Sequence, residues 1–156
     1  MTSPDRRALR RAAALLFNRT WTFLAKRKRA PREDEEMIAL AHASRALWEI
    51  VGKPVHFARG EWQVSRVYAV LLRTRPALLH ARRCLALCRA HRIGGFDLAY
   101  AYEAVARAST TARPLTRAAR RSSSRFRSLA EQAGASIRDP KDRAQFRRDL
   151  ATVGKF

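Results

Sequence analysis

Residues 64–84, with the sequence VSRVYAVLLRTRPALLHARRC, give the strongest indication of the fold. The first nine residues of this stretch form the apolar C-terminal part of one predicted helix. Thr74 and Pro76 then supply the N-cap and the first turn of a second helix. Three small side chains follow on one face of this second helix, because they are four and three residues apart: Ala77, Ala81 and Cys84. Small side chains allow two helix axes to approach closely, so the stretch predicts a tightly packed helical hairpin.

Proline and glycine divide the rest of the chain in the same way. Proline is favoured in the first turn of a helix, and glycine just beyond its end. From these signals we expect seven helices, over residues 3–27, 31–51, 54–72, 74–93, 95–111, 114–133 and 140–153. No run of alternating β-branched residues between turn dipeptides indicates a strand. The sequence therefore predicts an all-α protein of about seven helices, paired in antiparallel hairpins by short connections.

The helix expected over residues 31–51 carries a similar small-residue face. Ala39, Ala43 and Ala46 are four and three residues apart and share one side of that helix. By the same argument as for residues 77–84, we expect this face to pack closely against a neighbouring helix.

The helices expected over residues 54–72 and 95–111 are related by a shift of 34 residues. Val64, Ser65 and Tyr68 then align with Leu98, Ala99 and Tyr102. A large apolar residue, a small residue and a tyrosine, with small residues on the next helix, resemble the tetratricopeptide repeat. The resemblance covers roughly residues 31–120, with one good repeat and two degenerate ones. It implies a tetratricopeptide-like right-handed superhelix of stacked hairpins that ends in a short C-terminal capping helix.

This resemblance also divides the chain. We expect one helical-repeat domain over residues 1–156, with hairpins at about 1–52, 53–93 and 94–134, and a C-terminal helix and tail at 135–156.

A second resemblance is closer. The stretches AHASR (41–45), GEWQVSRVY (60–68) and FDLAYAYEA (96–104) are similar to a family of small uncharacterised bacterial proteins. That family has no known activity, so the second resemblance supports the architecture and leaves the function open.

The chain is strongly basic, with 33 Lys and Arg against 13 Asp and Glu and a formal net charge of +20. Because 28 of the bases are Arg and only 5 are Lys, part of this excess reflects the coding bias of a GC-rich genome. The remainder predicts attraction to anionic partners. No apolar run approaches the 18 residues of a membrane span. Cys84 and Cys88 have the spacing of buried helix residues, so we expect a reducing, cytoplasmic location.

A candidate binding surface follows from the tetratricopeptide resemblance, because the first helix of each hairpin lines a concave groove in that family. The groove residues would be Arg59, Trp62 and Arg66 from one helix and Phe96, Tyr100 and Glu103 from the next. Each set is spaced by three or four residues and shares one helix face. Arginine binds carboxylates and phosphates, and aromatic rings supply an apolar wall. We therefore expect a protein-interaction module that binds an acidic or C-terminal peptide of another protein.

A structural role is the alternative for the same residues. Trp62 and Phe96 at helical spacing are typical of a core, and Glu103 can serve to neutralise Arg59 or Arg66. The identity of the partner and the oligomeric state are open at this point.

A second class of function is suggested by the arginines of residues 113–125. Four of them, spaced by four residues, would form one stripe on the sixth helix: Arg113, Arg117, Arg121 and Arg125. Such a stripe can follow a phosphate backbone, so RNA or DNA binding is the alternative function. A solvated basic face is the competing interpretation, because no recognised nucleic-acid module fits the sequence.

An enzyme is the third interpretation. The sequence shows no nucleophile elbow, no phosphate-cradling loop and no zinc-ligand spacing, so we expect neither a metal ion nor a cofactor. His42 and His80 lie among small apolar residues, either as hydrogen-bonded core residues or as functional groups. Acid–base chemistry would need a histidine and a carboxylate to meet in a buried pocket.

Overall fold

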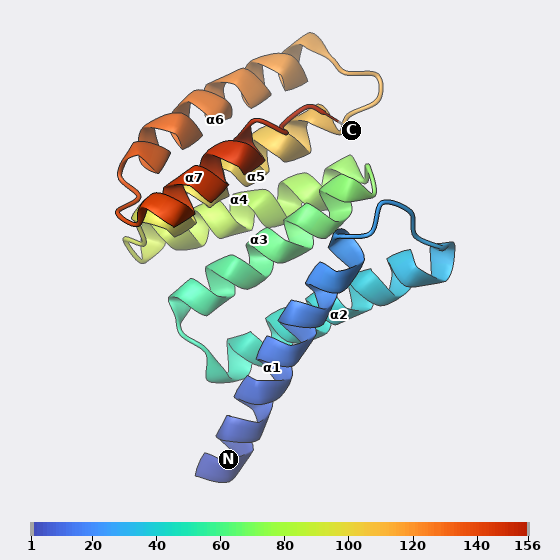
Figure 1. The fold of residues 1–156 in the computed structure, drawn as a ribbon, viewed down its shortest axis with the longest axis vertical. Coiled ribbons are helices and arrows are strands. Elements are labelled where there is room, and N and C mark those ends of the chain that lie inside the picture. Colours follow the sequence, from blue (N-terminus) through green and yellow to red (C-terminus); the bar gives the residue numbers. More distant parts are fainter. Residues whose placement is uncertain (1, 156) are drawn as a thin grey trace.

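The computed structural model describes residues 2–155, and within them the chain forms seven helices and no sheet. The helices are α1 (Ser3–Leu24), α2 (Pro31–Val51), α3 (Pro54–Val70), α4 (Thr74–Ala90), α5 (Gly95–Thr110), α6 (Arg117–Ala135) and α7 (Pro140–Leu150). The all-α prediction is confirmed, and Figure 1 shows the helices packed side by side. In this part of the chain, no helix combines the length and the apolar character that crossing a membrane requires.

Proline and capping residues set most helix starts. Pro31, Pro54 and Pro140 occupy the first turns of α2, α3 and α7, as predicted. Proline is tolerated there because its missing N–H would have no partner within the helix. Asp139 also caps α7, since its carboxylate accepts hydrogen bonds from two backbone N–H groups at 2.7 and 2.9 Å.

The expected start of the sixth helix is wrong. α6 begins at Arg117 rather than at Pro114, and the hydroxyl of Thr116 caps it by accepting a backbone hydrogen bond at 3.1 Å. A residue that precedes proline is sterically disfavoured in the helical conformation, so Arg113 stays outside the helix. Arg113 lies in the α5–α6 connection and donates to a carbonyl oxygen at the end of α5 at 2.9 Å. The predicted arginine stripe therefore loses its first member.

Consecutive helices pack as antiparallel neighbours, and the most extensive pairs are α1 with α2, α3 with α4 and α5 with α6. These pairs stack on one another, because α2 contacts α3, α4 contacts α5, and α3 contacts both α1 and α5. α7 follows the last pair and packs against α5 and α6 (Figure 1). The helices α1, α3, α5 and α7 thus succeed one another along one layer of the molecule.

The small-residue face of α4 packs as the sequence predicts. Ala77, Ala81 and Cys84 are buried in the central core, together with small residues of α5. The hydroxyl of Ser65 on α3 donates to the carbonyl oxygen of Ala77 at 2.9 Å. A side chain as short as serine can reach a neighbouring helix backbone only where the two helices approach closely.

The corresponding prediction for α2 is wrong. The alanine face is exposed: Ala39, Ala43 and Ala46. The buried face carries Met37, Ala41 and Ser44. Burying Met37 removes more apolar surface from water than burying an alanine, and Ser44 gains a hydrogen bond to a carbonyl oxygen of α1 at 2.8 Å. The two faces have the same spacing, so small-residue periodicity could not choose between them.

A large aromatic side chain and a buried arginine anchor α7. Phe146 is fully buried and lies over Gly134 of α6, where an added β-carbon would overlap the phenyl ring. Arg107 of α5 donates to the carboxylate of Glu103 at 2.6 Å and to the carbonyl oxygen of Asp149 at 2.8 Å. These contacts hold α7 against α5 and so position the side chains of its outer face.

Candidate functional site

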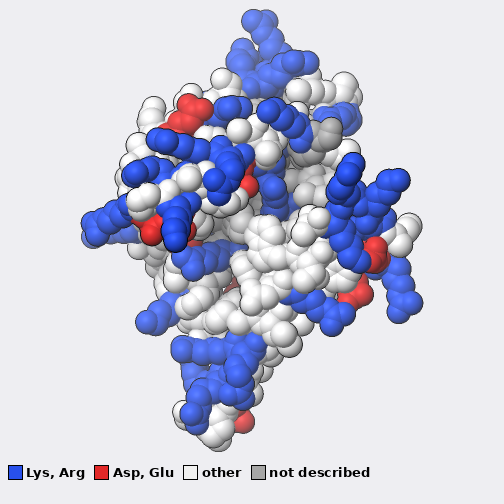
Figure 2. Space-filling view, in the orientation of Figure 1, with Lys and Arg blue, Asp and Glu red and all other residues white. Residues whose placement is uncertain are grey.

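A cavity of about 480 Å³ lies between α1, α3, α5 and α7. Figure 2 views the molecule from the side of α1 and α7 and shows uncharged surface in the middle of this face, surrounded by Lys and Arg. The volume is within the range of sites for small ligands and single peptide anchors.

Aromatic rings form one wall of the cavity: Phe17 and Trp21 of α1, Trp62 of α3, and Phe96 and Tyr100 of α5. Trp62 is in the middle of this wall, with its ring centroid 5.6 Å from that of Trp21 and 5.3 Å from that of Tyr100. Such separations are typical of aromatic pairs in contact. Trp62 and Phe96 also pack against the buried residues of α5 to α7. These two rings therefore belong to the core and to the cavity lining at the same time.

Arg66 of α3 brings a positive charge into this aromatic cavity. Its side chain is 23% exposed, and the nearest acidic oxygen, Oε1 of Glu103, is 3.6 Å away. That distance is longer than a hydrogen bond, and within residues 2–155 no group accepts one from this guanidinium. Burial, and then the charge of Arg107, lowers the pKa of Arg66, as expected for a cation short of counter-charge. The guanidinium of Arg66 therefore keeps N–H donors that a ligand can use.

Arg59, two turns earlier on α3, is already paired. Its Nε and one terminal nitrogen donate to the two carboxylate oxygens of Asp97 at 2.6 and 3.0 Å. This bidentate pair joins α3 to α5, and its hydrogen bonds are the first cause of the raised pKa of Arg59. Arg59 therefore lines the cavity while its charge is paired with Asp97 and connects α3 to α5.

α7 contributes three polar side chains to the cavity lining: Asp142, Gln145 and Asp149. The hydroxyl of Tyr100 donates to Asp149 at 2.6 Å, and the amide of Gln145 donates to the same oxygen at 3.1 Å. Burial, and then this hydrogen bond, raises the pKa of Tyr100, so its hydroxyl remains a donor. Asp142 is exposed at the edge of the cavity, and in the described chain its carboxylate has no hydrogen-bond or ion-pair partner.

The structure brings together five of the six groove residues expected from the sequence: Arg59, Trp62, Arg66, Phe96 and Tyr100. The sixth, Glu103, is 1% exposed and does not line the cavity, because it is the buried partner of Arg107. The contributions of α1 and α7 to the cavity were not predicted from the sequence. The spacing of Phe17 and Trp21, four residues apart on one helix face, was the signal available for α1.

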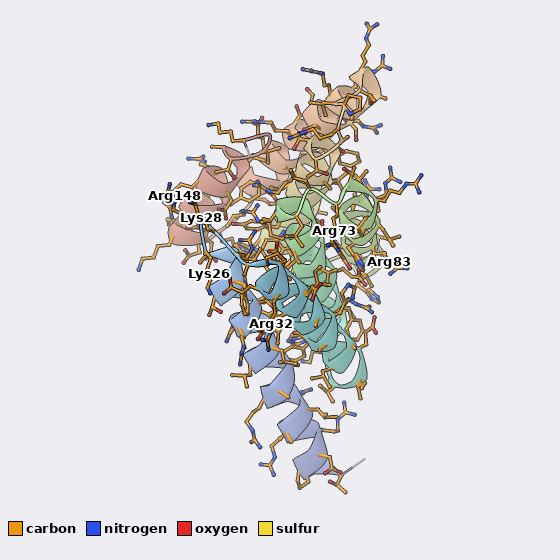
Figure 3. All side chains as sticks on the ribbon, turned by 90° about the vertical axis from the view of Figure 1, so that its right-hand side faces the viewer. Lys26, Lys28, Arg32, Arg73, Arg83 and Arg148 are labelled. Carbon is orange, nitrogen blue, oxygen red and sulfur yellow. The ribbon has the colours of Figure 1, made fainter. Side chains whose placement is uncertain are left out.

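The arginines of the second predicted surface are one part of a widely distributed basic surface. Exposed arginines without an acidic partner in the described residues remain on α6: Arg117, Arg121 and Arg125. Other elements carry exposed arginines as well. Figure 3 shows three of them, on α2, the α3–α4 turn and α4: Arg32, Arg73 and Arg83. Positive charge is therefore not concentrated on α6.

His42 and His80, whose role the sequence left open, lie in one polar cluster between α2, α3 and α4. Nε2 of His42 is 3.0 Å from the hydroxyl oxygen of Tyr68, and Nδ1 of His80 is 2.5 Å from Oε2 of Glu61. Glu61 also accepts a hydrogen bond from Arg45 at 3.0 Å. Neither histidine lines the cavity between α1, α3, α5 and α7. Among residues 2–155, no three His, Cys, Asp or Glu side chains are arranged to hold a metal ion.

The cavity has the general features of a binding site: a concave shape, an apolar wall and a small number of polar groups. No protein-family model, curated protein or solved structure matches this chain. What the cavity binds is therefore inferred from its own side chains.

Proposed function

We propose that this protein is an interaction module whose cavity binds an acidic or C-terminal peptide of another protein. A carboxylate of the peptide binds Arg66, and an apolar side chain packs against the aromatic wall around Trp62. The observation that carries this proposal is Arg66, a guanidinium that lines a concave aromatic site without an acceptor in the described chain. A planar guanidinium of this kind binds carboxylate through two parallel hydrogen bonds.

We also propose that the helices form a tetratricopeptide-like right-handed superhelix capped by α7. The hairpins stack so that α3, the first helix of its pair, contacts the first helices α1 and α5 of the pairs on either side. α3 and α5 carry the 34-residue repeat read from the sequence. First helices line the concave face in such arrays, and α1, α3 and α5 all border the cavity here.

The proposed location is the cytoplasm. Cys84 and Cys88 are both buried and free. The hydrogen bond with Cys88, and then burial, raises the pKa of Cys84, so this thiol stays protonated. Free thiols of this kind are usual in reducing compartments.

The binding proposal is tested with synthetic peptides that end in an apolar residue, each made with a free and with an amidated C-terminus. Titration is followed by the fluorescence of Trp21 and Trp62, which line the cavity. We expect the free acids to bind more tightly than the amides. Arg66→Gln should weaken their binding at least about tenfold, because hydrogen bonds to charged groups contribute about 1.5–3 kcal/mol each.

The matched control is Arg117→Gln, which removes the same charge from an exposed position on α6. Circular dichroism establishes that each variant is folded. Equal affinities of wild type and Arg66→Gln, or an equal loss in both variants, would contradict the proposal.

Nucleic-acid backbone binding is a second candidate function. The observation in its favour is that Arg117, Arg121 and Arg125 are exposed without acidic partners among residues 2–155. Affinity for a labelled RNA hairpin and a labelled DNA duplex should then fall steeply between about 50 and about 200 mM salt. Replacing Arg117 and Arg121 by Gln should reduce the salt slope by about two. Affinity that does not change with salt would exclude this candidate.

A further inference from the structure

Two helices that border the cavity each carry two residues of like charge, and the two residues have the same spacing on both helices. Arg59 and Arg66 are seven residues apart on α3, Asp142 and Asp149 are seven residues apart on α7, and all four line the cavity. The charge of Asp142 adds to the effect of Asp97 in raising the pKa of Arg59. Asp149 likewise opposes the burial that lowers the pKa of Arg66. Asp142 therefore lies near Arg59, and Asp149 lies near Arg66.

The two helices run in the same direction past the cavity (Figure 1). A helix rises about 1.5 Å per residue, so seven residues separate the two charged ends by about 10 Å. Because the helices run in this direction and Asp142 acts on Arg59 and Asp149 on Arg66, one end of the cavity holds Arg59 and Asp142, and the other holds Arg66 and Asp149.

At each end the side chain of one group is hydrogen-bonded within the fold and that of the other is not. Arg59 is held by Asp97, and Asp149 accepts hydrogen bonds from two neighbouring side chains. Arg66 and Asp142 have no hydrogen-bond partner in the described chain. The cavity therefore offers a cation at one end and an anion at the other, with the aromatic wall between them.

We infer that the bound segment is of mixed charge, with its C-terminal carboxylate on Arg66 and a basic side chain, two positions before the C-terminal residue, on Asp142. This inference rests on the proposed function and names the residue pattern that its partner must carry. An extended chain advances about 3.3 Å per residue, so three residues span the separation of about 10 Å between the two ends.

A purely acidic segment fits this cavity less well. Three carboxylates and two guanidinium groups line it, although bases outnumber acids by 33 to 13 in the chain. An acidic side chain near α7 would meet Asp142 as a like charge at the edge of the cavity. The acidic or C-terminal peptide of the proposed function is thereby narrowed to a C-terminal segment that carries a basic residue.

Three acetylated tripeptides with a free C-terminal carboxylate are the probes: acetyl-KAF, acetyl-AAF and acetyl-EAF. Their dissociation constants are measured by tryptophan fluorescence titration of the full chain. We expect acetyl-KAF to bind most tightly and acetyl-EAF least tightly, with about threefold between successive peptides, the size of an exposed ion pair.

Two variants of Asp142 locate the origin of this preference. Asp142→Asn should bring the ratio of the acetyl-KAF and acetyl-AAF affinities to about one, because the amide is uncharged. Asp142→Lys should reverse the order of the three peptides. The control is Glu35→Gln, which removes the same charge from an exposed carboxylate of α2 outside the cavity and should keep the preference for acetyl-KAF.

The outcomes separate this inference from the proposed function. An equal change of the ratio in Asp142→Asn and Glu35→Gln overturns the inference, because the preference then reflects the overall charge of the chain. Equal binding of the three peptides to wild type, with loss of all three in Arg66→Gln, overturns the inference and leaves the proposed function standing. Affinities that are unchanged in Arg66→Gln, or no binding of any peptide, overturn both.

Discussion

Single residues of the same type on the same helix face have different roles in this molecule. Arg59 and Arg66 are two turns apart on α3, and nothing in the local sequence distinguishes them. Asp97, 38 residues beyond Arg59, occupies the donors of that side chain. Arg66 has only Glu103 at 3.6 Å, and Glu103 is the hydrogen-bonded partner of Arg107. The residue types of the cavity could be predicted, but their pairing could not, because it depends on tertiary distances.

Arg107 is the arginine on which stability depends most directly. Arg107→Met should lower the free energy of unfolding by about 3–5 kcal/mol, because it leaves Glu103 buried without its main counter-ion. The variant also loses the hydrogen bond that holds the end of α7. Urea unfolding followed by circular dichroism measures the change.

The control for Arg107 is Arg127→Met, since Arg127 pairs with Glu131 on the surface of α6. The loss there should stay below about 1 kcal/mol. A similar loss of unfolding free energy in the two variants would show that the buried pair of Arg107 and Glu103 stabilises the fold no more than an exposed pair does.

The starts and buried faces of helices could be predicted where the local sequence determines them. They could not be predicted where packing against a neighbouring helix determines them. Pro31, Pro54 and Pro140 mark the starts of α2, α3 and α7. Pro114 does not mark the start of α6, because Thr116 supplies the N-cap two residues later. The buried face of α4 was predicted correctly and that of α2 was not. Two faces of α2 carry residues with the same spacing, and packing against α1 selects one of them.

The seating of α7 on α6 depends on the absence of a side chain at Gly134. Gly134→Ala should destabilise the protein by about 1–3 kcal/mol, because the new β-carbon would overlap the ring of Phe146. This loss runs against the better helix propensity of alanine, which favours the variant by about 1 kcal/mol. Thermal unfolding measures the difference.

Gly94→Ala is the matched control, since an added β-carbon there has nothing within 4 Å. It should lower the unfolding midpoint by less than Gly134→Ala does, because the expected cost is only the weaker N-cap that alanine gives to α5. Truncation of the ring in a Gly134→Ala, Phe146→Leu double variant should restore part of the lost stability. A fully stable Gly134→Ala variant would mean that Phe146 moves aside without cost.

The molecule as a whole should lose stability in acid because of the cluster between α2, α3 and α4. Burial, and then the charges of His80 and Arg45, lowers the pKa of His42 below 6.5. Burial acts to raise the pKa of Glu61, but the hydrogen bond from His80 and nearby positive charges outweigh it, so this pKa is lowered. In both cases the unfolded chain takes up a proton more readily than the folded chain, so stability falls as the pH falls.

The urea midpoint should therefore decrease between about pH 7.5 and about pH 5.5, the range in which unfolded His42 titrates. A second decrease should follow below about pH 4.5, as Glu61 becomes protonated. His42→Gln should reduce the first decrease, because glutamine does not titrate. His91→Gln, at an exposed position at the end of α4, is the control for replacing a histidine outside this cluster. Equal pH profiles of wild type and His42→Gln would exclude His42 as the origin.

Within the candidate site, the sequence predicted five of the side chains that line the cavity: Arg59, Trp62, Arg66, Phe96 and Tyr100. Its α3 and α5 residues follow from helical spacing and from the repeat resemblance. The α1 and α7 residues do not, because they reach the cavity only through the tertiary contacts of α1 with α3 and of α7 with α5. Asp142 illustrates the difficulty, since an acid in the first turn of α7 is locally explained by the helix dipole alone.

The cavity has a mechanical consequence, because its walls come from all three hairpins and from α7. The three hairpins stack so that, in the described chain, each contacts only the hairpins next to it, and each of these contacts resists bending separately. A ligand in this cavity would contact the first and the third hairpin, which do not contact one another in the described chain, and would connect them mechanically. Occupancy would therefore raise the bending stiffness of the entire stack, including its two ends.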